Sequence, residues 1–497
     1  MLANAYITVV IGILCAKALG FVRDVVFASS FGTSIEADIY FQIFGVANLV
    51  FTGIGVALST LIIKNINKSD SNNNGREYVS FFITKMSLLI IGATVLLYIL
   101  ARPITHLLLP QISSENFELA VNLMYIMLPS FLFVCVAYMI SGALQNRQVF
   151  FIPSIMSMPY NAVMIAVLLF GETDILRIGM FTTFGWFLHI VVQLPSFYRQ
   201  KYHLLSHSFS SAQETNIKRT AETVCIFISG MMFQFCFIID KAFVSYDEGL
   251  ISTITYASNL FITISGVFVV AMSSVVFPAI SQNYEHGERE YVRRLVSYVI
   301  IIMFSIFVPF LLVVTFFGYD IISLIYERGK FTAESTAATA PAFIIYCFGI
   351  FGYLAQNLLA KVLYLASRYR HTVVATIIVT TLKVLLDCFL IPIYGVNAAA
   401  LTTTLLLTFY AVFIGYSVRH VVGNSFDSPT LKVLGKVLLC AAISVGALFV
   451  FRALLPDFTG LGKAAFVVPL LLCGAVYILS AVFTGVVSAL QKNPLAK

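Results

Sequence analysis

The chain has 497 residues, of which 60% are hydrophobic and only 11% are charged, and its mean hydropathy is +0.94. This composition excludes a soluble domain and is typical of an integral membrane protein. The formal net charge of +7 follows from Lys and Arg in loops on one side of the predicted spans, so no nucleic-acid partner is expected.

Fourteen hydrophobic runs are long enough to be transmembrane helices, because a helical span takes about 20 residues. They are continuously apolar, which excludes the alternating strands of a membrane barrel. They lie at 5–31, 37–63, 78–101, 118–143, 150–171, 176–197, 220–243, 251–280, 293–318, 338–366, 371–393, 396–418, 430–453 and 463–489. The first run lacks the features of a signal peptide and is read as a retained span. The Lys and Arg excess predicts that both termini are cytoplasmic.

The chain partly repeats itself. The pattern Ala-Asn-Leu, five residues, then Gly-Val at 47–56 returns at 258–267 as Ser-Asn-Leu, five residues, then Gly-Val. We therefore expect two six-helix lobes related by a pseudo-twofold axis along the membrane normal, with the substrate held between them. The lobes would be residues 1–200 and 217–420, with helices 13 and 14 in residues 428–497.

The first span carries Lys17, Arg23 and Asp24. Each ionisable residue at such a depth costs about 2.5–3.5 kcal/mol by insertion scales, so these three are expected to face a polar cavity or a partner. Residues 17, 20 and 24 share one helix face, and Gly20 favours a bend or a close helix approach there. Snorkelling with an internal ion pair is the alternative.

Two further pairs of charges lie inside predicted spans. Lys383 and Asp387 are four residues apart in the eleventh span, and Asp240 and Lys241 lie toward the outer end of the seventh. Each pair either locks helices together as a buried ion pair or forms a cation-sensing or gating site.

Single polar residues occur within other spans, and interhelical hydrogen bonds are the simplest explanation for them. They are Asn48, Asn161, His189 and Gln193. All eight cysteines lie inside spans without the spacing of a metal site, so no metal or other cofactor is expected. In the outer segment 327–334, Thr332 is the predicted N-cap of the tenth span.

A set of short motifs runs from residue 19 to about residue 395. The first group is Leu19-Gly20-Phe21-Val22-Arg23-Asp24, Phe31-Gly32 and Ala37-Asp38. The others are Pro159-Tyr160-Asn161, Gln193-Leu194-Pro195, Asp240-Lys241, Gly266-Val267 through Phe277-Pro278, Glu327-Arg328-Gly329 through Phe331-Thr332, and Ile391-Pro392. Together these motifs resemble the MurJ/MviN family of lipid II flippases, which belongs to the MOP (multidrug, oligosaccharidyl-lipid, polysaccharide) exporter superfamily.

The resemblance implies two six-helix lobes around a central cavity, with helices 13 and 14 forming a groove for a polyprenyl tail. It also implies a function in peptidoglycan biosynthesis in the bacterial cytoplasmic membrane. An undecaprenyl-diphosphate-linked precursor would be moved from the inner to the outer leaflet by alternating access, by a protein acting as a monomer among membrane lipids.

The resemblance also suggests roles for single residues. Arg23 would grip the diphosphate, and Lys17 stands where the family often has another arginine. Asp24 and Asp38 would orient these cations and help to gate the outer side, while Asn161 would line the cavity.

The chain departs from the family pattern at two cationic positions. The stretch after Asn48, which commonly carries arginines, reads Leu-Val-Phe-Thr, and the arginine of helix eight is replaced by Asn259. Asn48 and Asn259 are themselves candidate substrate contacts, and the grip on the substrate would shift toward Lys17.

The resemblance points to a third departure, in the second lobe. Where the family can hold a cation, the matching residues are Asp240, Asp387 and Thr403, and Lys383 occupies a further position. We expect the ammonium of Lys383 to fill the place of a bound sodium ion, which would make transport independent of sodium. Coupling to the membrane potential or to another monovalent cation stays open.

The same sequence features leave other functions open. An exporter of another lipid-linked saccharide, of O-antigen or teichoic-acid type, is one alternative, and a cation-coupled drug antiporter is another. The antiporter is disfavoured because Lys17 and Arg23 suit an anion. No enzyme is expected, because the outer loops offer only scattered residues such as His106, Glu172 and Asp174.

Overall fold

The computed structural model describes residues 2–69, 75–171, 174–204, 235–272, 276–425, 427–454 and 467–491. Helices and turns make up these ranges, and no β-strand occurs within them. The predicted all-α class is therefore confirmed. Most of the predicted seventh span, as well as Glu172, lies outside the described residues.

Within the described ranges, nine helices are long and apolar enough to cross a membrane. They become ten if α15 (Ala333–Phe348) and α16 (Ile350–Leu365), which meet at 41°, form one bent span. The 30-residue helix α1 (Leu2–Phe31) is not among the nine, and it carries the three charges already noted. The polytopic architecture is thus confirmed, while the count of fourteen spans stays a prediction.

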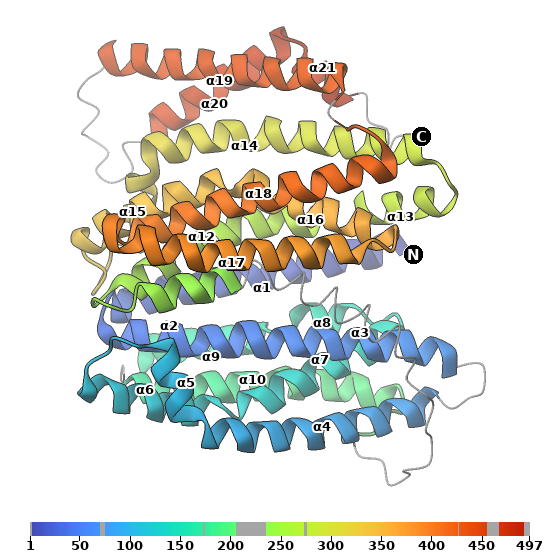
Figure 1. Cartoon of the computed structure of the whole chain (residues 1–497), viewed down its shortest axis with the longest axis vertical. Helices are drawn as coiled ribbons and strands as arrows, with labels where there is room; N and C mark the ends of the chain where they lie inside the picture. The colour runs from blue at the N-terminus through green and yellow to red at the C-terminus, as the bar shows by residue number, and fades with distance from the viewer. Residues whose placement is uncertain are drawn as a thin grey trace. The chain divides into compact units, whose positions relative to one another are not determined.

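By its internal contacts the chain forms two compact units, and the first comprises Met1–Tyr256 with Arg328–Phe331. The predicted lobe boundary at 200–217 lies inside this unit and stays a prediction. Its α-helices, labelled in Figure 1, are α1, α2 (Ile35–Val46), α3 (Thr52–Ser69), α4 (Gly75–Ile99), α5 (Ala101–Leu108), α6 (Ser114–Met127), α7 (Ser130–Asn146), α8 (Phe151–Ile155), α9 (Met158–Phe170) and α10 (Ile175–Arg199). A π-helical turn, η1 (Ala47–Phe51), joins α2 to α3.

Three of the predicted spans in this unit are interrupted. The second is divided by η1, the fourth is divided between α6 and α7, and the fifth between α8 and α9. At the α6–α7 junction Pro129 lacks the N–H that would continue the helical hydrogen bonds. Helices α3 and α7 pack closely, and two glycines allow this approach. A Cβ on Gly55 would lie 2.9 Å from the Tyr138 ring, and a Cβ on Gly142 would collide with Ser59.

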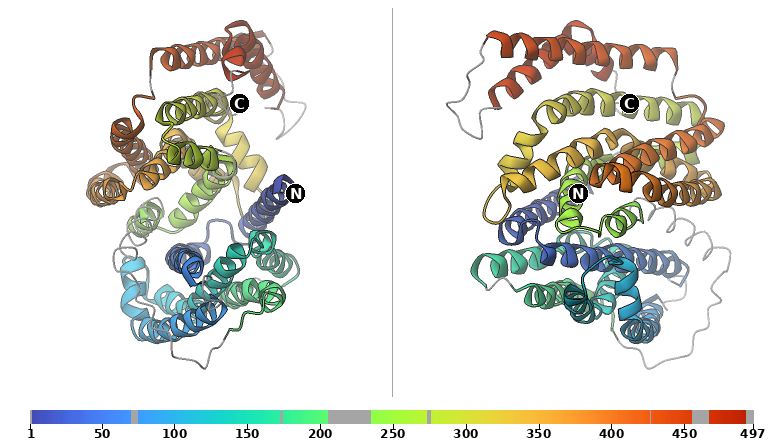
Figure 2. Two further views of the ribbon diagram at one scale, coloured as in Figure 1. Left: turned by 90° about the vertical axis from the view of Figure 1, so that its right-hand side faces the viewer. Right: turned by 60° about the vertical axis from the view of Figure 1, so that its left-hand side comes forward.

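The second unit comprises Ala257–Glu327 and Thr332–Lys497. It holds most of α12 (Leu250–Ala271), α13 (Phe277–Glu285), α14 (Arg289–Tyr326), α15, α16, α17 (Tyr369–Tyr394), α18 (Val396–Val422), α19 (Ser428–Leu454), α20 (Val467–Phe483) and α21 (Val486–Gln491). Helices α17 and α18 run side by side, as all views show (Figures 1 and 2). The predicted N-cap of α15 is confirmed, since Thr332 Oγ1 accepts from the Ser335 N–H at 3.3 Å.

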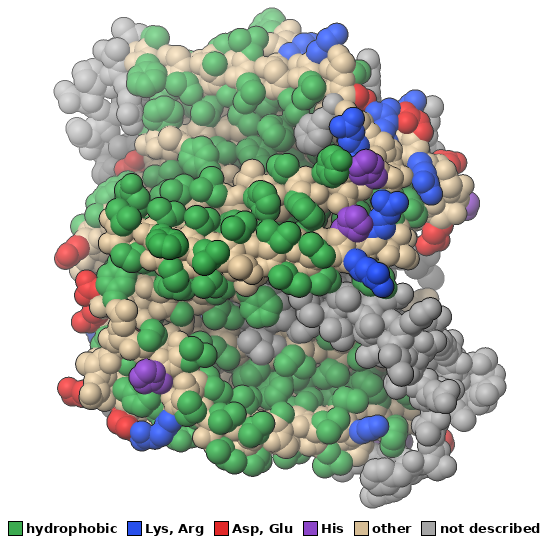
Figure 3. All heavy atoms as spheres, viewed as in Figure 1, with side chains coloured by type: hydrophobic (Ala, Val, Ile, Leu, Met, Phe, Trp, Pro, Cys, Tyr) green, Lys and Arg blue, Asp and Glu red, His purple; other side chains and the backbone are tan. Residues whose placement is uncertain are grey.

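Basic side chains gather at the end of this unit where α14 begins and α18 ends (Figure 3). Arg293 donates to the Asn424 carbonyl at 3.2 Å and to the Asp427 carboxylate at 2.8 Å. Hydrogen bonds from Thr430 and Arg293 hold the pKa of Asp427 below its ordinary value. This arrangement fixes the turn between α18 and α19.

Two glycines of the family-like motifs join distant parts of the first unit. Gly329 has φ +59° and Gly32 has φ +58°, in the left-handed region that other residues rarely adopt. A Cβ on Gly329 would collide with the Ser29 carbonyl oxygen, and one on Gly32 with the Lys330 carbonyl oxygen. The Lys330 N–H donates to the Ser29 carbonyl at 2.8 Å. The segment 328–331 is thus docked on the end of α1 through backbone contacts.

We predict that Gly329→Ala lowers the melting temperature of the detergent-purified protein by several degrees, since it adds a backbone collision to left-handed strain of about 1–2 kcal/mol. Gly287→Ala is the matched control, because Gly287 also has a positive φ of +80° but nothing lies within 4 Å of its added Cβ. Equal losses for the two variants would contradict the docking contact.

Candidate functional site

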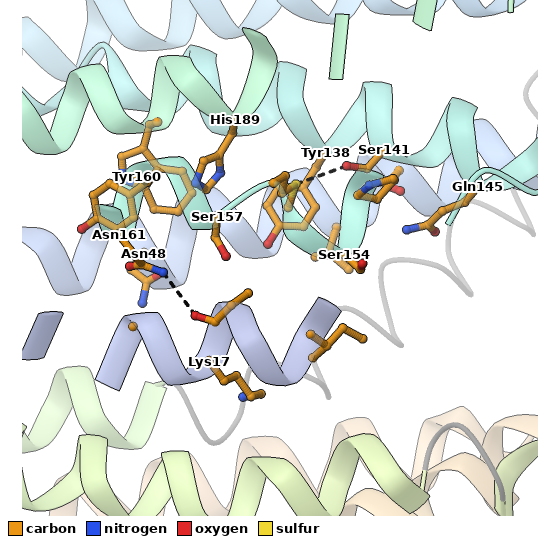
Figure 4. Close-up of a pocket in the computed structure, with 18 of the residues that line it drawn as sticks. Lys17, Asn48, Tyr138, Ser141, Gln145, Ser154, Ser157, Tyr160, Asn161 and His189 are labelled. Atoms are coloured by element: carbon orange, nitrogen blue, oxygen red, sulfur yellow. Dashed lines mark hydrogen bonds between the residues drawn. The ribbon is translucent and has the colours of Figure 1, made fainter. Parts of the chain in front are cut away.

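The first unit contains a cavity of about 640 Å³. It is lined by α1, the η1–α3 segment and helices α7 to α10 (Figure 4). Four of the predicted substrate contacts, Lys17, Arg23, Asn48 and Asn161, line it. The charged first span therefore faces a polar cavity, as expected from the energetic argument.

Arg23 is held from several sides within this cavity. Its Nη2 and Nε donate to Asp24 Oδ1 at 2.7 and 3.0 Å, and its Nη1 donates to Asn161 Oδ1 at 3.1 Å. The guanidinium also lies 5.2 Å from the ring centroid of Tyr160 and 5.7 Å from that of Phe44. Asn161 is itself fixed, because its Nδ2 donates to the Ala16 carbonyl at 3.3 Å. The result is a cation of set position whose charge is partly balanced by Asp24.

Lys17 differs from Arg23 in its contacts. Its side chain is half-buried and lines the cavity, yet it makes no hydrogen bond or ion pair with the described residues. Asn48 is exposed toward the cavity from η1, the π-helical turn that places an extra residue in the helix. An anion entering the cavity would therefore meet the fixed guanidinium of Arg23 and also the ammonium of Lys17, which the described residues leave unpaired.

Asp38 is placed elsewhere. Its two carboxylate oxygens accept from the backbone N–H groups of Gly249 at 2.7 Å and Ser252 at 2.6 Å. These bonds satisfy donors at the start of α12, where a carboxylate is also favoured by the helix dipole. In these contacts Asp38 caps a helix and does not orient Lys17 or Arg23, so its gating role stays a prediction.

The amino-acid sequence is similar to a known protein family along most of its length. The model of the lipid II flippase MurJ family matches residues 27–486. The chain belongs to the lipid II flippase MurJ family. The lipid II flippase MurJ of Burkholderia cenocepacia is 22% identical over 481 residues, which cover 93% of this chain and 92% of that protein. A probable lipid II flippase MurJ of Buchnera aphidicola subsp. Schizaphis graminum is 26% identical over 416 residues, 81% and 80% of the two chains.

Solved structures show the same fold. A lipid II flippase MurJ in an inward closed conformation matches with a TM-score of 0.79 at 23% identity, over 96% of this chain and 98% of that one. An inward-facing multidrug resistance MATE transporter of the MOP superfamily matches with a TM-score of 0.62 at 12% identity, over 86% and 99%. The predicted family is thus confirmed, and a family of flippases is one of transporters rather than catalysts. The match to the MATE transporter shows a shared fold.

The second unit of this MurJ family member contains the predicted pair Lys383 and Asp387, both 0% exposed. The Lys383 ammonium donates to Asp387 Oδ1 at 2.9 Å, to the Ala399 carbonyl at 3.1 Å and to Thr402 Oγ1 at 2.5 Å. It also lies 2.9 Å from Asp387 Oδ2. The pair therefore joins α17 to α18 through a cage of oxygen atoms.

Three other residues predicted for the cation site or the substrate cavity, Thr403, Asp240 and Asn259, make none of the contacts described above. The hydroxyl that reaches Lys383 belongs to Thr402, which the sequence did not single out, and its predicted neighbour Thr403 is also fully buried. Asp240 is buried in the first unit, whereas Asn259 lies on α12 in the second. Their proposed places in the cation site and in the substrate cavity stay predictions.

The second unit also has a cavity of about 390 Å³ with mostly apolar lining from α14, α16 and α18. The predicted groove for a lipid tail concerns α19 and α20, which pack on each other. That groove stays a prediction.

Sequence reasoning missed the aromatic lining of the first cavity. Tyr160 and Trp186 line it beside His189. The spacing of Trp186, His189 and Gln193 along one helix face was the available signal. Gln193 behaves as predicted, because it accepts from Ser141 at 2.7 Å and donates to the Ala137 carbonyl at 3.1 Å, between α10 and α7.

We predict that Lys383→Met destabilises the protein by about 3–5 kcal/mol, because it leaves the Asp387 carboxylate buried without its counter-charge. The double variant Lys383→Met with Asp387→Leu should recover most of the loss, since an apolar pair of similar volume needs no compensation. Melting temperatures in one detergent measure both effects. A single variant as stable as the wild type would contradict the buried ion pair.

Proposed function

We propose that the protein flips lipid II, an undecaprenyl-diphosphate-linked saccharide precursor of peptidoglycan, from the cytoplasmic to the outer leaflet of the bacterial inner membrane by alternating access. We further propose that it acts as a monomer with both termini in the cytoplasm. The single observation that carries the proposal is a cavity lined both by the fixed Arg23 and by Lys17, which has no partner among the described residues, in a chain of the lipid II flippase family.

The cargo's chemistry matches this cavity. A diphosphate and its sugars cannot cross hydrocarbon unaided, whereas the polyprenyl tail can stay in the lipid. Arginine suits oxyanions because its fork of N–H donors binds two oxygens at once, and lysine adds a mobile point charge. In this proposal Arg23 marks the position of the diphosphate, Lys17 supplies the second cationic contact, and Asn48 and Asn161 contribute polar groups beside them.

We predict that the wild-type gene restores growth to a strain depleted of its own lipid II flippase, and that Arg23→Ala does not. Loss of one charged hydrogen-bonding partner should lower the lipid II flipping rate in liposomes at least tenfold. Lys17→Ala should show a smaller loss.

Arg102→Ala is the matched control, because Arg102 forms an exposed ion pair with Glu118 at 2.8 Å, a type worth only about 0–1 kcal/mol. Growth supported by Arg23→Ala would remove Arg23 from its proposed role. Failure of the wild type to support growth, with the protein present in the membrane, would indicate another lipid-linked saccharide.

We also propose that transport is independent of sodium, because the Lys383 ammonium stands as a tethered cation among oxygen atoms of Asp387, Ala399 and Thr402. An ammonium and a sodium ion each satisfy carboxylate, carbonyl and hydroxyl oxygens. A side chain that fills such a cage leaves no exchangeable ion to couple.

We predict that sodium leaves wild-type flipping in liposomes unchanged at fixed membrane potential and pH. Lys383→Asn, which replaces the ammonium by an amide oxygen, should gain sodium-dependent thermal stability and flipping. Lys383→Met offers no added oxygen ligand and is the control. Stimulation of the wild type by sodium, against potassium at equal ionic strength, would overturn the proposal.

A further inference from the structure

Three aromatic side chains form one wall of the cavity in the first unit. They are Tyr160 on α9 and Trp186 and His189 on α10, and their exposed fractions are 3%, 5% and 3%. The ring centroids of Trp186 and His189 are 4.7 Å apart. The ring centroid of Tyr160 lies 5.9 Å from that of Trp186 and 6.0 Å from that of His189. Figure 4 shows the His189 ring directed from its helix toward Tyr160 and Ser157. We refer to Tyr160, Trp186 and His189 as the aromatic wall.

Three nitrogen atoms of this wall have no partner among the residues that the structure describes. The indole nitrogen of Trp186 and both ring nitrogens of His189 are buried and make no hydrogen bond within the described part of the chain. Buried polar atoms are nearly always paired, so three unpaired ones beside a cavity indicate a ligand. Gln193, one turn along α10, shows the contrast, because hydrogen bonds to α7 and to the His189 carbonyl satisfy its amide.

The wall begins directly beside Arg23. The Tyr160 ring lies 5.2 Å from the Arg23 guanidinium and also contacts Trp186 and His189, so it is shared by the cation and the wall. Gly185 makes this placement possible, because a Cβ there would collide with the Tyr160 ring. A group bonded to an anion held at Arg23 would therefore lie against the wall.

We infer that the aromatic wall binds the sugar that is attached to the diphosphate. Aromatic faces pack against the C–H faces of a pyranose, the indole N–H donates to a sugar hydroxyl, and neutral imidazole both donates and accepts. A purely apolar ligand would leave all three nitrogens unpaired, and an ammonium could satisfy only the acceptor nitrogen of the imidazole. This inference rests on the proposed function and adds to it that the first cavity recognises the glycan as well as the diphosphate.

The chain has a single tryptophan, so Trp186 fluorescence reports on this wall alone. Full-length protein in detergent is titrated with lipid II and, separately, with undecaprenyl diphosphate, which lacks sugar. We expect both lipids to bind the wild type, with lipid II changing the Trp186 emission and binding about tenfold more tightly.

His189→Phe keeps a ring but removes both nitrogens, and it should weaken lipid II binding about tenfold while the affinity for undecaprenyl diphosphate is unchanged. Trp186→Phe, followed by displacement of a labelled lipid, should give the same selective loss if His189→Phe fails to fold. Tyr98→Phe is the control, because Tyr98 lies in the same unit and donates to the Tyr125 carbonyl at 2.9 Å without lining the cavity.

A lipid II affinity that both wall variants leave at the wild-type value would overturn the inference while the proposed function stands. Equal losses for both lipids would also overturn it, because the wall would then act only through packing on Arg23. Failure of the wild type to bind either lipid would overturn the proposed function, and the inference with it.

Discussion

The cavity depends on how one guanidinium is held at membrane depth. Arg23 reaches Asp24 in its own helix and Asn161 on α9, and two aromatic rings lie within about 6 Å of it. An arginine left unpaired at this depth would be costly, and a fully neutralised one would not attract an anion. The structure lies between these limits, because Asp24 offsets part of the desolvation cost, while Lys17, which has no partner among the described residues, leaves a net positive charge. Placement of α1 against α9 thus serves both folding and binding.

In the second unit, the buried charges are enclosed by the protein and line neither of the two cavities described above. Lys383 and Asp387 are completely buried, and the ammonium contacts oxygens from both α17 and α18. A pair so enclosed gains little net energy over an apolar pair, but it fixes the register between two helices. The two units therefore contain the same kinds of charged residues, in one case open to a cavity and in the other satisfied by the protein.

The sequence predicted those features that follow from the cost of burying charge and from helix length. The all-α membrane class, the cavity beside Lys17 and Arg23, the pairing of Lys383 with Asp387, and the N-cap at Thr332 are of this kind. Features that depend on tertiary approach could not be read from it. Whether Thr402 or Thr403 reaches Lys383 depends on the rotation of α18, and the role of Asp38 as a cap depends on a segment about 210 residues away. The spacing of Trp186, His189 and Gln193 places them on one face of α10, but the approach of Tyr160 from α9, which completes the aromatic wall, depends on tertiary packing.

The π-helical turn at Ala47–Phe51 has a consequence for how the chain tolerates changes in length. One extra residue in a helical turn rotates everything that follows by about 100°, since an α-helix has 3.6 residues per turn. Gly55 and Ser59 lie on the face of α3 that packs on α7 only because this extra residue is present. Deleting a single residue from the turn would make the helix regular, yet it would turn that small-residue face away from its neighbour. The joint between α2 and α3 is thus less tolerant of a one-residue deletion than of most substitutions.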